Sequence, residues 1–415
     1  MIPQLSSIAA ILSSTLIFLI GNGLLNTLIP VRAHLEGFST LAIGIIGSAY
    51  FAGFVLGCFT GPRWLARVGH IRTFAVCAGI AAAATLAQSM LVSVSVWILM
   101  RALFGFASAN MYMALESWLN DRSRNETRGR IFASYMSVNF GGLLIGQLLF
   151  ATARPESFAL FSVATIFYAL CLIPVGLTAL PQPAPAPVPV LRPLRLFRIS
   201  PVGVAGCIAV GLANSAIWTL APVYAQSRGL SSGMIALFMC AFTIGGTLVQ
   251  LPLGRLSDRM DRRYIIAVVC ALSAAAGVAI ALFVGRGHGV MLWSAALLGT
   301  LMLPLYGLSV AHANDRIPRE AFVESSATLL LINSLASVLG PTIAAAVMDG
   351  FGAQSLFLFT AAIHLTMTIF TVVRLRQKQA PGGEHREKYE PLPHQASPSA
   401  LELDPRGPEE AEKAA

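Results

Sequence analysis

Long apolar stretches alternate with short polar segments along most of this chain. Each stretch holds about 20 residues, which is the length that an α-helix needs to cross a hydrocarbon core of roughly 30 Å. The stretches run over residues 6–30, 41–61, 72–92, 94–118, 131–152, 157–179, 202–225, 232–253, 264–285, 290–312, 321–347 and 352–373. The pattern therefore predicts an all-α membrane protein with twelve transmembrane helices.

The two halves of this pattern repeat each other at an offset of about 190 residues. An Asn stands eight residues before a Pro in both halves, at Asn22 and at Asn214. A Tyr stands eight residues before an Asn-Asp-Arg sequence in both halves, at Tyr112 and at Tyr306. Parallel duplication of a six-helix unit is one of the layouts that builds a transporter with a central site. The repeat therefore indicates two pseudo-symmetric six-helix bundles.

Two segments lie outside the apolar stretches and divide the chain into domains. The first carries a Pro-Ala run followed by three Arg residues, which is typical of a semi-rigid linker. The second is polar and rich in Pro, with charges of both signs, and cannot bury enough apolar area to fold. We therefore expect an N-terminal six-helix bundle at residues 1–180, a cytoplasmic linker at 181–200, a C-terminal six-helix bundle at 201–375 and a disordered cytoplasmic tail at 376–415.

The composition is that of a protein surrounded by lipid, and the positions of the charged residues predict how the chain is oriented across the membrane. Hydrophobic residues make up 56% of the chain and charged residues 11%, whereas roughly 25% of the residues of a soluble domain are charged. The mean hydropathy is +0.72. Of the 28 Lys and Arg residues, 23 fall in alternate loops, in the linker and in the tail, which follows the positive-inside rule. We therefore expect a multi-pass protein of the bacterial inner (plasma) membrane with both termini in the cytoplasm.

The same features limit the partners of the chain. The net charge of +9 does not indicate nucleic acid, because the basic residues set the topology and no basic stripe with interleaved aromatic residues occurs. The six Cys residues lie in predicted spans without the spacing of metal ligands, so we expect neither a metal nor a cofactor. The expected partners are the lipid bilayer and a small-molecule substrate, and we expect a monomer.

The loop after the eighth stretch carries a recognisable motif. Residues 254–263 read Gly-Arg-Leu-Ser-Asp-Arg-Met-Asp-Arg-Arg, with Asp258 and Arg259 four and five residues after the Gly. This loop resembles the signature of the major facilitator superfamily. The resemblance implies that Asp258 pairs with helix ends and Arg groups and that the loop gates the cytoplasmic side. The first-half equivalent keeps Arg67 but has Ala66 in place of the Asp, so a charge relay is expected in the second half only.

Two further motifs extend the resemblance over residues 1–375. Arg101 and Gly105 resemble the Arg-x-x-x-Gly motif of the family's fourth helix. The sequence from Glu116 to Asn120, with the Arg-rich loop that follows, is similar to the YcaD-type bacterial permeases. The resemblance implies a permease but names no substrate. The fifth helix lacks the Gly-x-x-x-Gly-Pro pattern of drug/proton antiporters, which weakens that alternative without removing it.

The fourth helix supplies a polar stripe. Arg101, Gly105, Ser108, Tyr112 and Glu116 share one face at helical spacing, and such a face is expected to line a water-filled cavity. Ionisable groups within a membrane are costly and therefore candidates for function. Arg101 is a candidate for binding a substrate anion or relaying a proton, and Glu116 for a proton site or gate. The alternatives are that Arg101 snorkels outward and that Glu116 bonds to the Arg residues of its own loop.

Amide and aromatic side chains supply the other candidates. Asn22 and Asn26 lie one turn apart on the first helix, and Asn214 and Trp218 take the matching positions on the seventh. Amides in a pseudo-twofold cavity would suit a hydroxylated or amide-bearing solute, whereas interhelical hydrogen bonding is the structural alternative. The predicted substrate-binding residues are Asn22, Asn26, Arg101, Tyr112, Asn214, Trp218 and Tyr306, and the predicted coupling or gating residues are Glu116, Arg67, Asp258 and Arg259.

Three classes of function are considered for a membrane protein of this pattern. The leading hypothesis is a secondary active transporter that moves a small organic solute by alternating access, with coupling to protons left open. A drug or metabolite exporter acting by proton antiport is the alternative within this class. An intramembrane enzyme lacks any catalytic motif in the sequence, so we expect no enzyme. A non-transporting membrane sensor on a transporter fold would usually carry an added signalling domain.

Overall fold

The computed structural model describes residues 2–123, 125–178, 183, 191–283, 287–318, 321–377, 389–392 and 397–402. Within these ranges the chain is helical and contains no strand. The helices are α1 (Ile2–Leu35), α2 (Thr40–Val68), α3 (His70–Met90), α4 (Val94–Asp121), α5 (Asn125–Leu149), α6 (Ala159–Leu170), α7 (Leu172–Gly176), α8 (Pro193–Ile199), α9 (Pro201–Ser227), α10 (Ser232–Arg259), α11 (Arg262–Phe283), α12 (His288–Met302), α13 (Pro304–Asn314), α14 (Phe322–Phe351) and α15 (Ser355–Gln377), with short 3-10 helices η1 (Phe150–Thr152) and η4 (Pro398–Glu402).

Twelve segments of the described residues are long and apolar enough to cross a membrane, which confirms the predicted fold class. Two of them are interrupted helices: α6 with α7, and α12 with α13. Proline accounts for both breaks, because it lacks the N–H that would bond to the carbonyl one turn earlier. Pro174 is the third residue of α7, and Pro304 is the first residue of α13.

Several helices run past the ends that hydropathy predicts. The second apolar stretch ends at residue 61, whereas α2 continues through Pro62 to Val68. Hydropathy detects only the apolar part of a helix, which contacts the lipid chains. The helical hydrogen bonding continues into the polar residues beyond that part. Gly69 then turns the chain into α3 with a φ of 86°, a conformation that glycine adopts at little cost.

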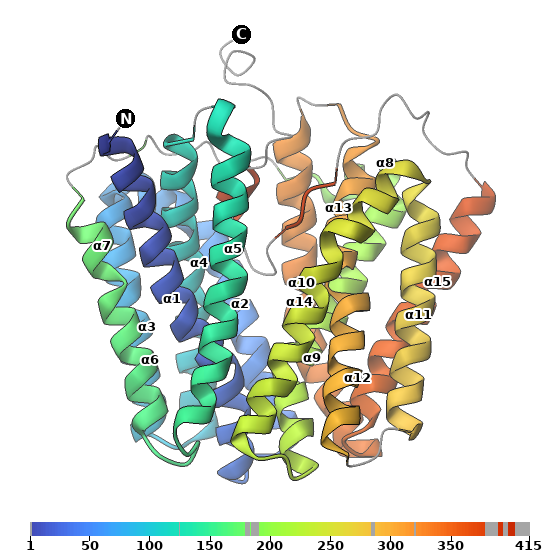
Figure 1. The fold of residues 1–415 in the computed structure, drawn as a ribbon, viewed down its shortest axis with the longest axis horizontal. Helices are drawn as coiled ribbons and strands as arrows, with labels where there is room; N and C mark the ends of the chain where they lie inside the picture. Colours follow the sequence, from blue (N-terminus) through green and yellow to red (C-terminus); the bar gives the residue numbers. More distant parts are fainter. Residues whose placement is uncertain are drawn as a thin grey trace. The chain divides into compact units, whose positions relative to one another are not determined.

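The chain divides into two compact units. Unit 1 comprises residues 1–32, 49–190 and 393–415, and unit 2 comprises residues 33–48 and 191–392. The helices within each unit run along a common direction (Figure 1). The predicted division at the linker differs from these units in two segments, residues 33–48 and the end of the tail. Residues 181–182 and 184–190 of the predicted linker lie outside the described residues, and α8 forms part of the remainder.

The start of α2 belongs to unit 2 because it packs on α14. Gly44 lies so close to Pro341 that an added Cβ would come within 2.6 Å of the Pro341 carbonyl oxygen. The Ser48 and Thr342 hydroxyls are 2.7 Å apart. The Leu41 N–H donates to Asp349 Oδ2 at 3.0 Å. These contacts join the N-terminal end of α2 to the C-terminal half of α14.

Glycines bring pairs of helices into close contact in both units. In unit 1 a Cβ on Gly53 of α2 would overlap the Ala102 carbonyl of α4, and one on Gly105 would overlap the Tyr50 carbonyl. In unit 2 Gly245 of α10 meets the Ala296 carbonyl and Gly299 of α12 meets the Phe242 carbonyl in the same way. Small residues let membrane helices approach closely, and the same crossing is built twice.

Parts of the C-terminal tail are packed. Tyr389 and Leu392 are buried in unit 2, and Ser397 and Ala400 are buried in unit 1. This packed segment lies within the stretch for which the composition predicts disorder. The reason is a set of specific contacts with acidic and glycine positions far away in the sequence, which composition does not reveal. Residues 378–388, 393–396 and 403–415 of the tail lie outside the described residues, and the prediction for them is untested.

Candidate substrate and gating sites

A buried arginine forms the centre of a polar cluster in unit 1. Arg101 on α4 is 5% exposed. Its guanidinium carbon lies 4.6 Å from the centre of the Tyr50 ring and 5.1 Å from the centre of the Phe104 ring. Both distances suit cation–π attraction. Among the described residues no carboxylate pairs with Arg101, and its Nε and Nη1 atoms have no hydrogen-bond partner. Aromatic faces are therefore the groups that stabilise this charge in the described structure.

Other polar atoms lie in the same region. The Tyr168 hydroxyl lacks a hydrogen-bond partner in the described structure. The Asn22 amide lies close to the Tyr50 and Tyr112 hydroxyls, and the Ser108 hydroxyl lies close to that of Tyr50, but none of these contacts has the geometry of a good hydrogen bond. Buried polar groups in proteins are nearly always hydrogen-bonded to protein or water. This cluster is therefore suited to hold water or a polar solute.

Aromatic rings hold the cluster together. The ring of Phe18 from α1 lies 5.1 Å from that of Tyr112, and the ring of Phe104 lies 5.4 Å from that of Tyr168, both edge-on. The structure thus brings the predicted residues Asn22, Arg101 and Tyr112 into one region. Asn26 lies one turn beyond Asn22 and is half-buried. The hypothesis that Arg101 snorkels outward does not fit its burial.

Sequence reasoning missed two members of the cluster, Tyr50 and Tyr168. Each is a lone Tyr within an apolar helix, on α2 and on α6. A phenol in the middle of a span needs a polar partner, so its position could have served as a signal. Hydropathy scales give tyrosine an intermediate value, and the pattern of apolar residues therefore conceals it.

The matching candidates in unit 2 form a smaller polar group. Asn214 and Trp218 lie one turn apart on α9, and Tyr306 lies on α13, which packs against α9. The Asn214 side-chain oxygen and the Tyr306 hydroxyl have no hydrogen-bond partner in the described part of the chain. The Trp218 ring packs edge-on against Phe242 with 5.4 Å between ring centres. No charged side chain corresponds to Arg101 among these three residues.

Glu116 is fully buried near the end of α4 and accepts hydrogen bonds on both oxygens. The Tyr135 hydroxyl from α5 donates to Oε1. The Ser397 N–H and hydroxyl donate to Oε2 at 2.9 Å and 2.5 Å. Tyrosine and serine donors, rather than the Arg residues of the following loop, are thus its hydrogen-bond partners in the described structure.

The signature loop of unit 2 forms a buried ion-pair network. Arg262 is 1% exposed, and its Nη1 lies 2.9 Å from Asp258 Oδ1. Its Nε donates to Asp315 Oδ2 at 2.8 Å. The Ser257 hydroxyl accepts from Nη1 at 2.8 Å. Burying these charges is tolerable because every charged partner is paired and hydrogen-bonded.

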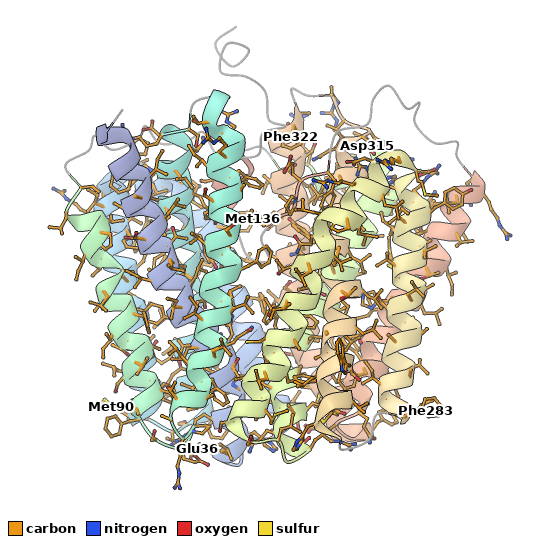
Figure 2. All side chains as sticks on the ribbon, viewed as in Figure 1. Glu36, Met90, Met136, Phe283, Asp315 and Phe322 are labelled. Carbon is orange, nitrogen blue, oxygen red and sulfur yellow. The ribbon has the colours of Figure 1, made fainter. Side chains whose placement is uncertain are left out.

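Asp315 is the member of this network that sequence reasoning left out. It belongs to the repeated Asn-Asp-Arg sequence, which was noticed as architecture but given no electrostatic role. Figure 2 shows Asp315 and Phe322 at one end of the helices of unit 2, with Phe283 at the other end. The network therefore lies at the end of unit 2 that also holds the α10–α11 connection.

The remaining charged candidates are placed differently. Arg67 and Arg259 occupy the last turns of α2 and α10 and are exposed. Asp261, between α10 and α11, is bound by Arg263 with 2.7 Å between Oδ2 and Nη2. Burial by itself raises the pKa of Asp261, but hydrogen bonds from the Arg263 side chain and amide, with the nearby positive charges, lower that pKa below its ordinary value.

Two other features offer little polar chemistry. Among the described residues no three His, Cys, Asp or Glu side chains are grouped to hold a metal ion. A groove of about 410 Å³ in unit 2 is lined almost wholly by apolar side chains of α9 and α15, including Leu212 and Phe370. Such a groove has no group that would recognise a charged solute.

The fold and the polar cluster buried among its helices are those of a membrane transporter, and comparison with known proteins identifies its family. The profile of the Major Facilitator Superfamily matches residues 11–321 and 203–405. The chain belongs to this family and is a secondary transporter, which confirms the family that the loop at residues 254–263 predicts.

Curated relatives are of the same kind. The chain is 27% identical over 371 residues to the "Uncharacterized MFS-type transporter YcaD" of Escherichia coli O139:H28, covering 88% of this chain and 94% of the relative. It is 26% identical over 377 residues to the "Uncharacterized MFS-type transporter Ent638_1421" of Enterobacter sp. (strain 638), covering 90% and 96%. These relatives confirm the predicted resemblance to the YcaD-type permeases and place the chain among multi-pass bacterial membrane proteins.

Solved structures share the fold at low sequence identity. The nucleoside transporter NupG superposes with a TM-score of 0.72 at 15% identity, covering 91% of this chain and 100% of that one. A bacterial homolog of the human lysosomal transporter Spinster, in an inward-facing and occupied conformation, gives 0.73 at 15% identity over 93% and 98%. The D-xylose-proton symporter gives 0.71 at 12% identity over 92% and 98%. At such identities the likeness shows the fold alone.

Proposed function

We propose that this transporter moves a small organic anion by alternating access, with Arg101 as the group that binds the negative charge. The observation that carries the proposal is a buried guanidinium that no carboxylate of the described chain neutralises. A charge within a membrane protein is retained where it has a task. Tyr168 adds an unsatisfied hydroxyl, and Asn22 and Ser108 add weakly bonded polar groups, which suits a solute that also carries hydroxyl or amide groups.

The remaining parts of the proposal concern energy supply and setting. Glu116 is the proposed coupling residue, because it is a buried carboxylate on the same helix as Arg101. We propose further that the protein is a monomer of the bacterial inner membrane with both termini in the cytoplasm, and that it catalyses no chemical reaction. The distribution of Lys and Arg between alternate loops supports this orientation.

The test is a ligand screen followed by flux measurement. Purified protein is screened by thermal shift against small carboxylates and sugar phosphates, each paired with its neutral amide or alcohol analogue, since a ligand of the folded state raises the apparent stability. The anions are expected to raise the unfolding temperature and their neutral analogues to leave it unchanged. Active anions are then tested for counterflow in proteoliposomes.

Substitutions of Arg101 test whether this residue binds the anion. Arg101→Gln should abolish the shift caused by the active anion, and Arg101→Lys should weaken it, because lysine keeps the charge but loses the planar fork. Arg154→Gln, a change at an exposed arginine outside the cluster, is the control. Equal binding of the anion by wild type and Arg101→Gln would contradict the proposal. Counterflow limited to cationic or neutral drugs would instead support the alternative of a drug exporter.

A further inference from the structure

Two short pieces of the C-terminal tail occupy sites that fit them closely. Tyr389–Leu392 packs in unit 2 and Ser397–Glu402 packs in unit 1. Tyr389 is 6% exposed and Ser397 is 0% exposed. A polar, Pro-rich segment has little tendency to bury itself without a partner surface. The groups that surround the tail should therefore account for its burial.

The site in unit 2 receives an aromatic ring and a backbone N–H. The Tyr389 ring lies against Gly254 of α10 and Gly307 of α13, and a Cβ added at either glycine would collide with the ring. The Tyr389 N–H donates to Asp258 at 3.0 Å to Oδ1 and 3.2 Å to Oδ2. The two glycines leave a slot for the ring, and the carboxylate of the ion-pair network binds the chain beside it.

The site in unit 1 receives Ser397. Its N–H and hydroxyl both donate to Glu116 Oε2, while its hydroxyl oxygen accepts from the Ser399 N–H at 3.2 Å. Ser397 thereby caps the start of η4, which packs against α4. With the Tyr135 hydroxyl on Oε1, every oxygen of Glu116 has a donor. A main-chain N–H can only donate, so a proton on Oε2 would compete with the Ser397 donors for the lone pairs of that oxygen and would weaken docking.

We propose that Tyr389–Leu392 and Ser397–Glu402 form an autoinhibitory segment that docks on Asp258 and Glu116 and must leave before the transporter can work. The proposal rests on the role of Glu116 in coupling proposed above. Docking occupies the Glu116 oxygens that a coupling ion would need. It also adds a ligand to Asp258, the residue that the Arg262 network holds in place. The segment thus acts as an internal ligand of the resting transporter.

Docking is tested without any substrate, by hydrogen exchange on the full-length protein in lipid nanodiscs. A synthetic peptide of residues 386–404 supplies the unprotected rate. In wild type the amides of Tyr389 and Ser397 should exchange at least about tenfold more slowly than in the peptide, because one is bonded to the half-buried Asp258 and the other to the buried Glu116. Exchange at the rate of the free peptide would overturn the proposal.

Substitutions in the two sites identify the contacts that carry the protection. Gly254→Ala should release the Tyr389 segment, because the new methyl group fills the slot. Gly233→Ala on the same helix faces open space and is the matched control. Glu116→Leu should release the Ser397 segment by removing its acceptor. Protection that survives both Gly254→Ala and Glu116→Leu would show that the tail does not dock as described.

Inhibition is tested by the flux of the active anion from the screen. Tyr389→Ala and Ser397→Ala should raise the initial rate, whereas Ser399→Ala, which keeps the amide that bonds to Ser397, should not. A tail docked nine-tenths of the time predicts about a tenfold rise on release. A protected tail whose release leaves the rate unchanged would overturn the inhibitory role. Absence of anion flux in every variant would overturn the proposed function and the inhibition with it, while hydrogen exchange still decides docking.

Discussion

At the scale of single residues, the molecule separates two ways of keeping charge inside a membrane protein. Arg262 is enclosed by two carboxylates and a hydroxyl, whereas Arg101 has aromatic faces and unsatisfied neighbours. The charge of Arg262 is neutralised by side chains of the chain itself. The charge of Arg101 is not, and a buried cation of this kind would be stabilised strongly by a ligand of opposite charge. The difference in local partners therefore separates a structural arginine from a candidate binding residue.

Glu116→Gln should uncouple transport from the proton gradient and leave binding of the solute in place. The amide keeps the shape of the carboxyl group and an oxygen that accepts hydrogen bonds, but it cannot titrate. Uptake driven by an imposed pH gradient should fall to the rate without a gradient, while counterflow continues. Glu36→Gln makes the same change at an exposed carboxylate outside the cluster and is the control. Gradient-driven uptake unaffected by Glu116→Gln would remove Glu116 from the coupling role.

The polar stripe on α4 could be predicted from sequence because its members recur at helical spacing. Arg101, Tyr112 and Glu116 stand out as polar residues in an apolar segment. Their partners could not be predicted in the same way. Tyr50 and Tyr168 come from other helices, and Ser397 follows Glu116 by 281 residues. Such contacts depend on how helices pack, which a one-dimensional pattern does not contain.

At the scale of helices, the buried network joins the end of α10 to the starts and ends of its neighbours. Arg262 is the first residue of α11, Asp258 lies in the last turn of α10, and Asp315 directly follows α13. Three helix termini thus meet on one side chain. The family resemblance predicted that Asp258 would pair with Arg groups. Asp315 could have been included only if the repeated Asn-Asp-Arg sequence had been considered as a source of charged partners.

Removing one partner of this network should destabilise unit 2 strongly. Asp315→Ala leaves the Arg262 guanidinium without one of its charged partners, and breaking a buried ion pair in this way typically costs about 3–5 kcal/mol. The thermal midpoint of the purified protein should fall clearly. Asp121→Ala, the repeat-related change at an exposed carboxylate, is the control and should leave the midpoint almost unchanged. Equal midpoints for the two variants would contradict the assignment of the network.

The close crossing of α2 and α4 gives a second prediction for helices. Gly105→Ala should lower the yield of folded protein, because its methyl group would overlap the Tyr50 carbonyl. Gly79→Ala on α3 meets open space and should be neutral or stabilising, since alanine exceeds glycine in helix propensity by about 1 kcal/mol. Size-exclusion chromatography of detergent extracts compares the two. A monodisperse Gly105→Ala protein with the wild-type midpoint would show that the crossing can relax.

At the scale of the whole molecule, hydropathy and charge predicted more than they could for a soluble protein. Lipid demands a fixed length of apolar helix and permits no irregular backbone facing it, so the number and order of the spans follow from composition. This constraint from the lipid does not apply to segments outside the bilayer, so hydropathy does not predict their structure. This is why the extensions of α2 beyond the apolar core, the α8 helix and the packed tail segments all differ from the sequence-based expectations.

The proposed orientation can be tested with single cysteines. Glu36 and Asp315 lie at opposite ends of the helices of unit 2 (Figure 2). Glu36→Cys should react with a membrane-impermeant maleimide in intact cells, and Arg259→Cys should react only after permeabilisation, because both positions are exposed. Five of the six native cysteines are buried and the other is half-buried, so wild type supplies the background. The reverse pattern of labelling would place the termini outside the cytoplasm.

The internal repeat finally shows that the two halves fill the same pair of positions with different chemistry. Ala66 and His70 occupy the positions that Asp258 and Arg262 occupy in the second copy, and His70, like Arg262, is buried at the first residue of its helix. An arginine at position 70 without an acid at position 66 would be a buried charge without its partner. The first half has a histidine there instead, whose Nε2 lies 3.1 Å from the Ser117 hydroxyl. Building the ion pair of the second half into the first would accordingly require Ala66→Asp and His70→Arg together.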